Sequence, residues 1–175
     1  KTYGGDLAIG AYGIVNRIVF LFIMIVMGFN QGMQPIAGYN FGARQFDRLI
    51  QVLKYTIFCG VTVTTVGFLA GQIFPRPLIY LFTSDETLTN IAVEGLRIVL
   101  LFFPVVGFQM VTSSFFQSIG MAKKAIFLSL TRQLLFLIPS LLVFPSIWGT
   151  VGVWMSMPVA DAIATIVAAC MLRWQ

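Results

Sequence analysis

The chain has 175 residues, of which 58% are hydrophobic and only 10% are charged, and its mean hydropathy is +0.92. A soluble domain usually carries about 25% charged residues, so this composition excludes a soluble globular fold and indicates a surface that faces lipid. The net charge of +5 comes from basic residues scattered between apolar runs. They form no patch for a phosphate backbone, so nucleic acid is not expected as a partner.

Five apolar runs are each long enough to cross a bilayer, which requires roughly 20 apolar residues. Pro104 and Pro158 fall inside two of these runs, where neighbouring helices of a bundle can satisfy the freed carbonyl groups. The sequence therefore predicts an all-α, polytopic membrane helix bundle with five transmembrane helices. The predicted spans cover about residues 7–35, 53–74, 91–119, 125–144 and 151–172.

The connections between these runs alternate in charge. The first connection carries Arg44 in a basic stretch, the third carries Lys123, and the C-terminal end carries Arg173. The second connection is acidic around Asp85, and the fourth carries no charge. Since basic loops are retained in the cytoplasm, the first and third connections and the C-terminus are expected there. The lipid bilayer itself is the expected surrounding partner.

A stripe of amide and aromatic side chains follows one face of the first run. At 100° per residue its members fall within a narrow arc. The stripe could line a water-filled or substrate-binding surface, or it could be an interhelical seam in which amides hydrogen-bond two helices together. Its members are Tyr12, Asn16, Phe20, Met27, Asn30 and Gln34.

The third run carries a polar face below Pro104. Gln109, Thr112 and Ser113 share this face with Phe116. A kink at the proline would turn carbonyl groups toward a cavity. Both a pathway lining and simple helix packing explain these residues.

Asp161 lies about midway along the fifth run, which places it near the bilayer centre. It shares a helical face with Trp154, Met157 and Thr165. Desolvation disfavours the charged form of such a carboxylate, which suits proton binding, cation binding or attraction of a cationic substrate. Alternatively, it pairs with an arginine or caps backbone donors near Pro158. Taken together, the candidate residues of a substrate or ion pathway are Asp161, Asn16, Asn30, Gln34, Gln109, Ser113, Met27 and Trp154.

Catalytic chemistry is not indicated by the sequence. There is no histidine, and Cys59 and Cys170 each lie inside an apolar run, as small buried hydrophobic residues do. No metal-spaced cluster, phosphate loop or nucleophile with a base is present in the sequence. We therefore expect no catalytic residue, no metal ligand and no enzymatic activity.

Several motifs in order resemble the multidrug and toxin extrusion (MATE) transporter family. Residues 28–44, GFNQGMQPIAGYNFGAR, resemble the helix-to-loop signature of that family, and residues 3–14 are similar to the start of its helix 8. Residues 116–120 resemble the exit of helix 10, and residues 152–161 resemble helix 12. The resemblance covers essentially the whole chain and identifies it as helices 8 to 12.

The resemblance implies the C-terminal lobe of a fold with two six-helix bundles around a central cavity. Residues 1–175 would form a partial C-terminal transmembrane bundle, and the missing N-terminal lobe of the same protein would be its partner. It also implies a multi-pass protein of the bacterial inner membrane that exports amphipathic organic cations or drugs. The antiport would be driven by sodium or protons as the coupling ion, by alternating access, without another cofactor.

Two further functions remain open. A lipid-linked saccharide flippase of the same superfamily would require a strongly basic cavity, whereas Arg17, Arg97 and Arg132 are the only arginines within the predicted spans. A non-transporting membrane scaffold would require no carboxylate at the midplane. The third run also departs from the family, because it lacks a carboxylate below Glu94, where some members bind sodium.

Overall fold

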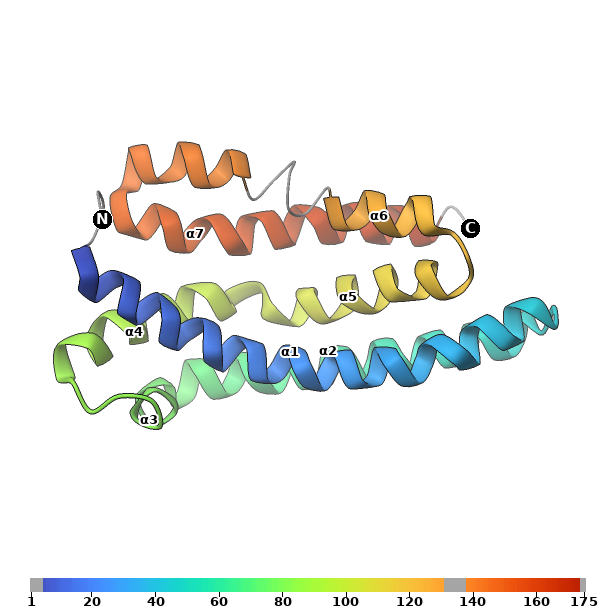
Figure 1. The fold of residues 1–175 in the computed structure, drawn as a ribbon, viewed down its shortest axis with the longest axis horizontal. Coiled ribbons are helices and arrows are strands. Elements are labelled where there is room, and N and C mark those ends of the chain that lie inside the picture. Colours follow the sequence, from blue (N-terminus) through green and yellow to red (C-terminus); the bar gives the residue numbers. More distant parts are fainter. Residues whose placement is uncertain (1–4, 131–137, 174–175) are drawn as a thin grey trace.

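The structure, a computed structural model, describes residues 5–130 and 138–173 and is an elongated bundle of helices (Figure 1). No strand occurs in the described part of the chain, which confirms the predicted all-α class. Four helical segments of this part are long and apolar enough to cross a membrane. They are Leu7–Gly42, Phe46–Ile73, Glu86–Ser118 and Trp154–Arg173.

The first two helices form a long hairpin. Helix α1 (Gly5–Gly42) contains Pro35, and α2 spans Phe46–Ile73. Arg44 lies between them with φ of 57°, a left-handed conformation. The backbone N–H of Gln45 donates to the carbonyl of Asn40 at 2.9 Å, a bond that closes the C-terminal end of a helix. The turn is therefore tight, and α2 packs along α1.

A short helix and a capped loop join α2 to the next span. Helix α3 (Pro75–Tyr80) is followed by α4 (Glu86–Val99), whose first turn is capped by the carboxylate of Asp85. This carboxylate accepts hydrogen bonds from the N–H groups of Thr87 at 2.8 Å and Leu88 at 3.3 Å. The cap satisfies donors that the first turn of a helix leaves unpaired.

The third predicted run is interrupted near its middle. A 3₁₀ turn, η1 (Leu100–Phe102), joins α4 to α5 (Phe103–Ser118), with Pro104 in the first turn of α5. Proline lacks an N–H donor and fits the first turn of a helix. The irregularity therefore falls where a kink at Pro104 was expected.

The last described elements are α6 (Ala122–Leu130) and α7 (Ile138–Arg173). Gly149, with φ of 59° and ψ of −133°, interrupts α7, and Figure 1 shows the two parts of α7 running in opposite directions. The predicted span at 125–144 falls partly on residues 131–137, which lie outside the described residues, so the five span boundaries stay predictions.

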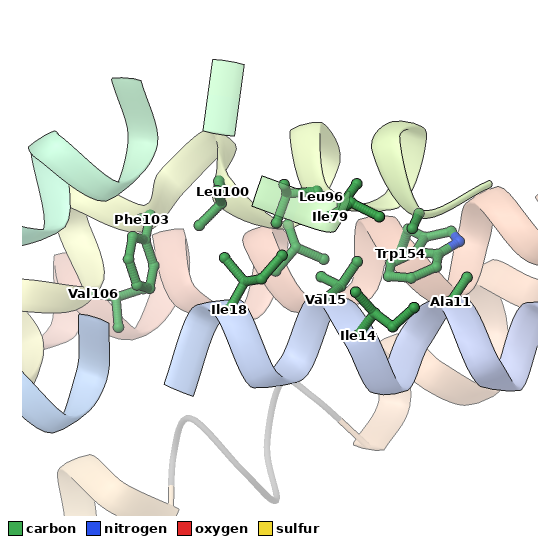
Figure 2. Close-up of a cluster of buried hydrophobic side chains, with 12 residues drawn as sticks. Ala11, Ile14, Val15, Ile18, Ile79, Leu96, Leu100, Phe103, Val106 and Trp154 are labelled. Atoms are coloured by element: carbon green, nitrogen blue, oxygen red, sulfur yellow. The ribbon is translucent and has the colours of Figure 1, made fainter. Parts of the chain in front are cut away.

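Two clusters of buried apolar side chains hold the bundle together. The first lies toward the start of α1 and includes Val15, Leu96, Leu100 and Trp154 (Figure 2). The second lies toward the other end of α1 and includes Phe116. A cavity that includes polar residues lies beside these clusters, among the helices that they join.

Candidate functional site

A cavity of about 460 Å³ lies among α1, α4, α5, α6 and α7. Its apolar wall consists of Val19, Ile23, Val99, Phe103, Val106, Met110 and Ala160. Its polar wall consists of Asn16, Gln109, Ser113, Ser114, Gln117, Ser129 and Asp161. Asp161 is the one charged residue among these described lining residues. The described lining of the cavity therefore combines a hydrophobic surface with the carboxylate of Asp161.

Three helices bring the principal polar residues together. Asn16 comes from α1 and is half-buried, Gln109 comes from α5 and is 3% exposed, and Asp161 comes from α7 and is 8% exposed. A carboxylate that is screened from water in this way attracts a cation more strongly than one at the surface, because the local dielectric constant is lower.

Hydroxyl groups connect the helices at the level of the cavity. Thr165 Oγ1 donates to the carbonyl oxygen of Asp161 at 2.8 Å and to that of Val105 at 3.4 Å. Ser113 Oγ lies 3.3 Å from Ser129 Oγ, which joins α5 to α6. The contact from Thr165 to Val105 joins the segment that carries Asp161 to α5.

Gln109 lines the cavity and carries a buried acceptor oxygen. Its Oε1 is buried and has no hydrogen-bond partner in the part of the chain that the structure describes. An unpaired buried oxygen costs about 1–3 kcal/mol, and such groups in folded proteins call for an explanation such as a bound water or ion. Gln109 Oε1 is therefore a candidate ligand for a cation or a donor group.

Four of the predicted pathway residues are brought together by the fold. Asn16, Gln109, Ser113 and Asp161 all line the cavity. They come from three different parts of the sequence, so their convergence depends on tertiary packing.

The other four predicted residues lie outside the cavity lining. Trp154 is 7% exposed and packs in the first apolar cluster, with its ring 5.6 Å from the ring of Tyr12. Met27 is 43% exposed, and Asn30 is buried with an unpaired Oδ1 among the described residues. Gln34 is half-buried one turn further along α1. Their part in a pathway remains a prediction.

Some cavity residues were not among the predicted ones. Gln117 lies two turns after Gln109 on the polar face of α5, so the same spacing could have included it. Ser129 carries no such signal, since its place depends on how α6 packs. Among the described residues, no three His, Cys, Asp or Glu side chains could hold a metal ion together.

Comparison with known proteins places the chain in a family. The MatE family model matches residues 1–142. The multidrug export protein MepA of Staphylococcus aureus (strain N315) is 26% identical over 164 residues, which are 94% of this chain and 36% of that protein. The chain thus spans little more than a third of the length of this curated relative.

Solved structures share the same fold. The MATE multidrug transporter DinF-BH is 35% identical with a TM-score of 0.87, and the match covers 98% of this chain and 39% of DinF-BH. A MOP superfamily transporter from Pyrococcus furiosus, whose reversed pocket polarity suggested a different function, is 25% identical with a TM-score of 0.89 over 99% of this chain and 39% of that one. The predicted resemblance is confirmed: this multi-pass membrane chain belongs to the MatE family.

Proposed function

We propose that the complete protein is a secondary active antiporter that exports amphipathic organic cations or drugs. The observation that carries this proposal is the cavity in which Asp161 faces an apolar and amide-rich wall. The names of two similar proteins support it, since MepA is a multidrug export protein and DinF-BH is a multidrug transporter.

The cavity suits a flat, amphipathic cation. Phe103 and Met110 provide apolar contact area, and Asp161 provides the countercharge. Gln109 and Asn16 provide amide groups that can accept hydrogen bonds from the bound cation or donate hydrogen bonds to it. A small number of polar groups in a mostly apolar pocket fixes the orientation of a ligand.

Competition for the carboxylate of Asp161 would account for the proposed exchange of ion and substrate. Asp161 can neutralise one monovalent cation at a time, so a proton or a sodium ion bound there competes with a cationic substrate. Coupling then requires that the ion favour one state of the transporter and the substrate favour the other. The N-terminal lobe would complete the site, and the two lobes would move against each other to expose it to each side in turn.

The flippase alternative is less favoured by the cavity. A pyrophosphate group requires basic side chains, and the described lining contains an acid instead. No observation favours the scaffold alternative. We place the protein in the bacterial inner membrane with the C-terminus in the cytoplasm, supported by Arg173 in the last turn of α7 and by the positive-inside rule.

Ethidium efflux from cells that express the complete gene tests the proposal. The wild type is compared with Asp161→Asn and with Glu94→Gln, which removes an exposed carboxylate on α4 outside the cavity. Sodium and proton gradients are collapsed separately. We expect efflux to depend on one gradient, to be lost in Asp161→Asn and to persist in Glu94→Gln. Efflux that is absent from the wild type under all conditions, or unchanged in Asp161→Asn, contradicts the proposal.

A further inference from the structure

A second hollow lies on the outside of the bundle, on α2. It measures about 500 Å³ and is separate from the cavity that contains Asp161. Its residues follow one face of the helix, and none of them belongs to the buried face of α2. They are Lys54, Ile57, Phe58, Val61, Thr62, Thr65 and Val66, and we call this surface the α2 groove.

The α2 groove is apolar despite its two threonines. Thr62 Oγ1 donates to the carbonyl of Phe58 at 2.7 Å, and Thr65 Oγ1 donates to that of Val61 at 2.7 Å. Since both hydroxyl donors are used within the helix, the threonines present mainly their methyl groups. A hydrocarbon chain can therefore lie along the groove without leaving a donor unpaired.

Lys54 lies at one end of the α2 groove, at the boundary of the charge-free stretch of α2. No charged residue occurs from 55 to 75, a stretch that spans about 30 Å as a helix and so matches the hydrocarbon thickness of a bilayer, about 30 Å. Lys54 is therefore at the depth of the lipid headgroups. It is exposed, and it forms no ion pair within the part of the chain that the structure describes.

The charge around this end is complementary to an anion. Arg44 and Arg48 precede Lys54 in the same hairpin, and Asp47 is the one acid between residues 38 and 54. Each basic residue near a membrane surface adds attraction for anionic lipids. The α2 groove is therefore apolar along its length and positively charged at the end where Lys54 lies.

We propose that the α2 groove binds one acyl chain of an anionic phospholipid, whose headgroup is held by the ammonium group of Lys54. The apolar side chains Ile57, Val61 and Val66 contact the acyl chain, and the basic end of the hairpin selects the anionic headgroup. The proposed site does not depend on the proposed transport activity.

Native mass spectrometry of the complete protein tests this site. The protein is offered equal amounts of phosphatidylglycerol and phosphatidylcholine with identical acyl chains. We expect the wild type to retain phosphatidylglycerol preferentially, and Lys54→Gln to reduce that preference about fivefold. Lys123→Gln, which removes an exposed lysine away from the groove, serves as the matched control and should keep the preference.

A second variant tests the acyl-chain part separately. Thr62 is exposed, so Thr62→Phe fills the groove while Lys54 is retained. It should reduce the retention of both lipids. The proposal is overturned if Lys54→Gln behaves as the wild type does, if Lys123→Gln reduces the preference equally, or if glycerol 3-phosphate alone displaces the lipid. The last result would indicate a simple phosphate site.

Discussion

Substituting Gly107 by alanine should weaken the contact between α2 and α5. A Cβ atom at Gly107 would lie 2.5 Å from Thr64 Oγ1 and 2.7 Å from the carbonyl oxygen of Gly60. The second distance is about 0.7 Å shorter than an ordinary van der Waals contact. Because a helical carbonyl cannot rotate away, the two helices must separate. We expect a loss of about 2–3 kcal/mol, at the upper end of the range for overpacking.

Two further glycines provide a graded comparison. At Gly71 the added Cβ would meet the end of the Leu100 side chain, which can rotate, so Gly71→Ala should cost less, about 1 kcal/mol. At Gly28 the Cβ would meet nothing within 4 Å, so Gly28→Ala should be close to neutral.

The assay is equilibrium unfolding of the complete protein by SDS in mixed micelles. The account requires the order Gly107→Ala, then Gly71→Ala, then Gly28→Ala in the free energy of unfolding that is lost. An equal effect of all three substitutions, or a neutral Gly107→Ala, would refute the close packing of α2 on α5.

Three further substitutions have expected outcomes. Trp154→Ala removes a large side chain from the first apolar cluster and should cost about 3–5 kcal/mol in the same unfolding assay. Gln109→Leu removes a buried oxygen without a partner among the described residues. The free energy of unfolding of the protein should therefore change by less than about 1 kcal/mol, while its affinity for the dye should fall. A large loss of stability would show that the amide is structural. Asp85→Ala removes the cap of α4 and should cost about 1 kcal/mol without changing dye binding; no loss of stability would contradict the cap.

The helical content could be predicted because its causes are local. Apolar runs of span length, separated by short polar connections, indicate membrane helices without knowledge of their neighbours. The break before α5 could also be predicted, since Pro104 restricts the local backbone. Gly149 lies between the predicted spans 125–144 and 151–172, and its positive φ is a conformation that glycine adopts readily.

The cavity was only partly predictable because it depends on how the helices pack. A helical wheel groups Asn16 with Met27, but the wall of the cavity follows Asn16, Val19 and Ile23, which leaves Met27 at the exposed edge of the stripe. Asn30 lies about 21 Å further along the axis of α1 than Asn16, beyond the described cavity. The angular pattern therefore included Asn16 but neither Val19 nor Ile23, because the position of the cavity wall depends on the contacts of α5, α6 and α7.

Direct dye binding to the purified complete protein tests the central claim, that the cavity around Asp161 binds the transported cation. Ethidium affinity is measured by fluorescence anisotropy for the wild type, Asp161→Asn and the control Glu94→Gln. Loss of the countercharge should weaken binding about tenfold, which corresponds to about 1.4 kcal/mol, and the control should bind as the wild type does. Equal affinity of the wild type and Asp161→Asn would contradict the account.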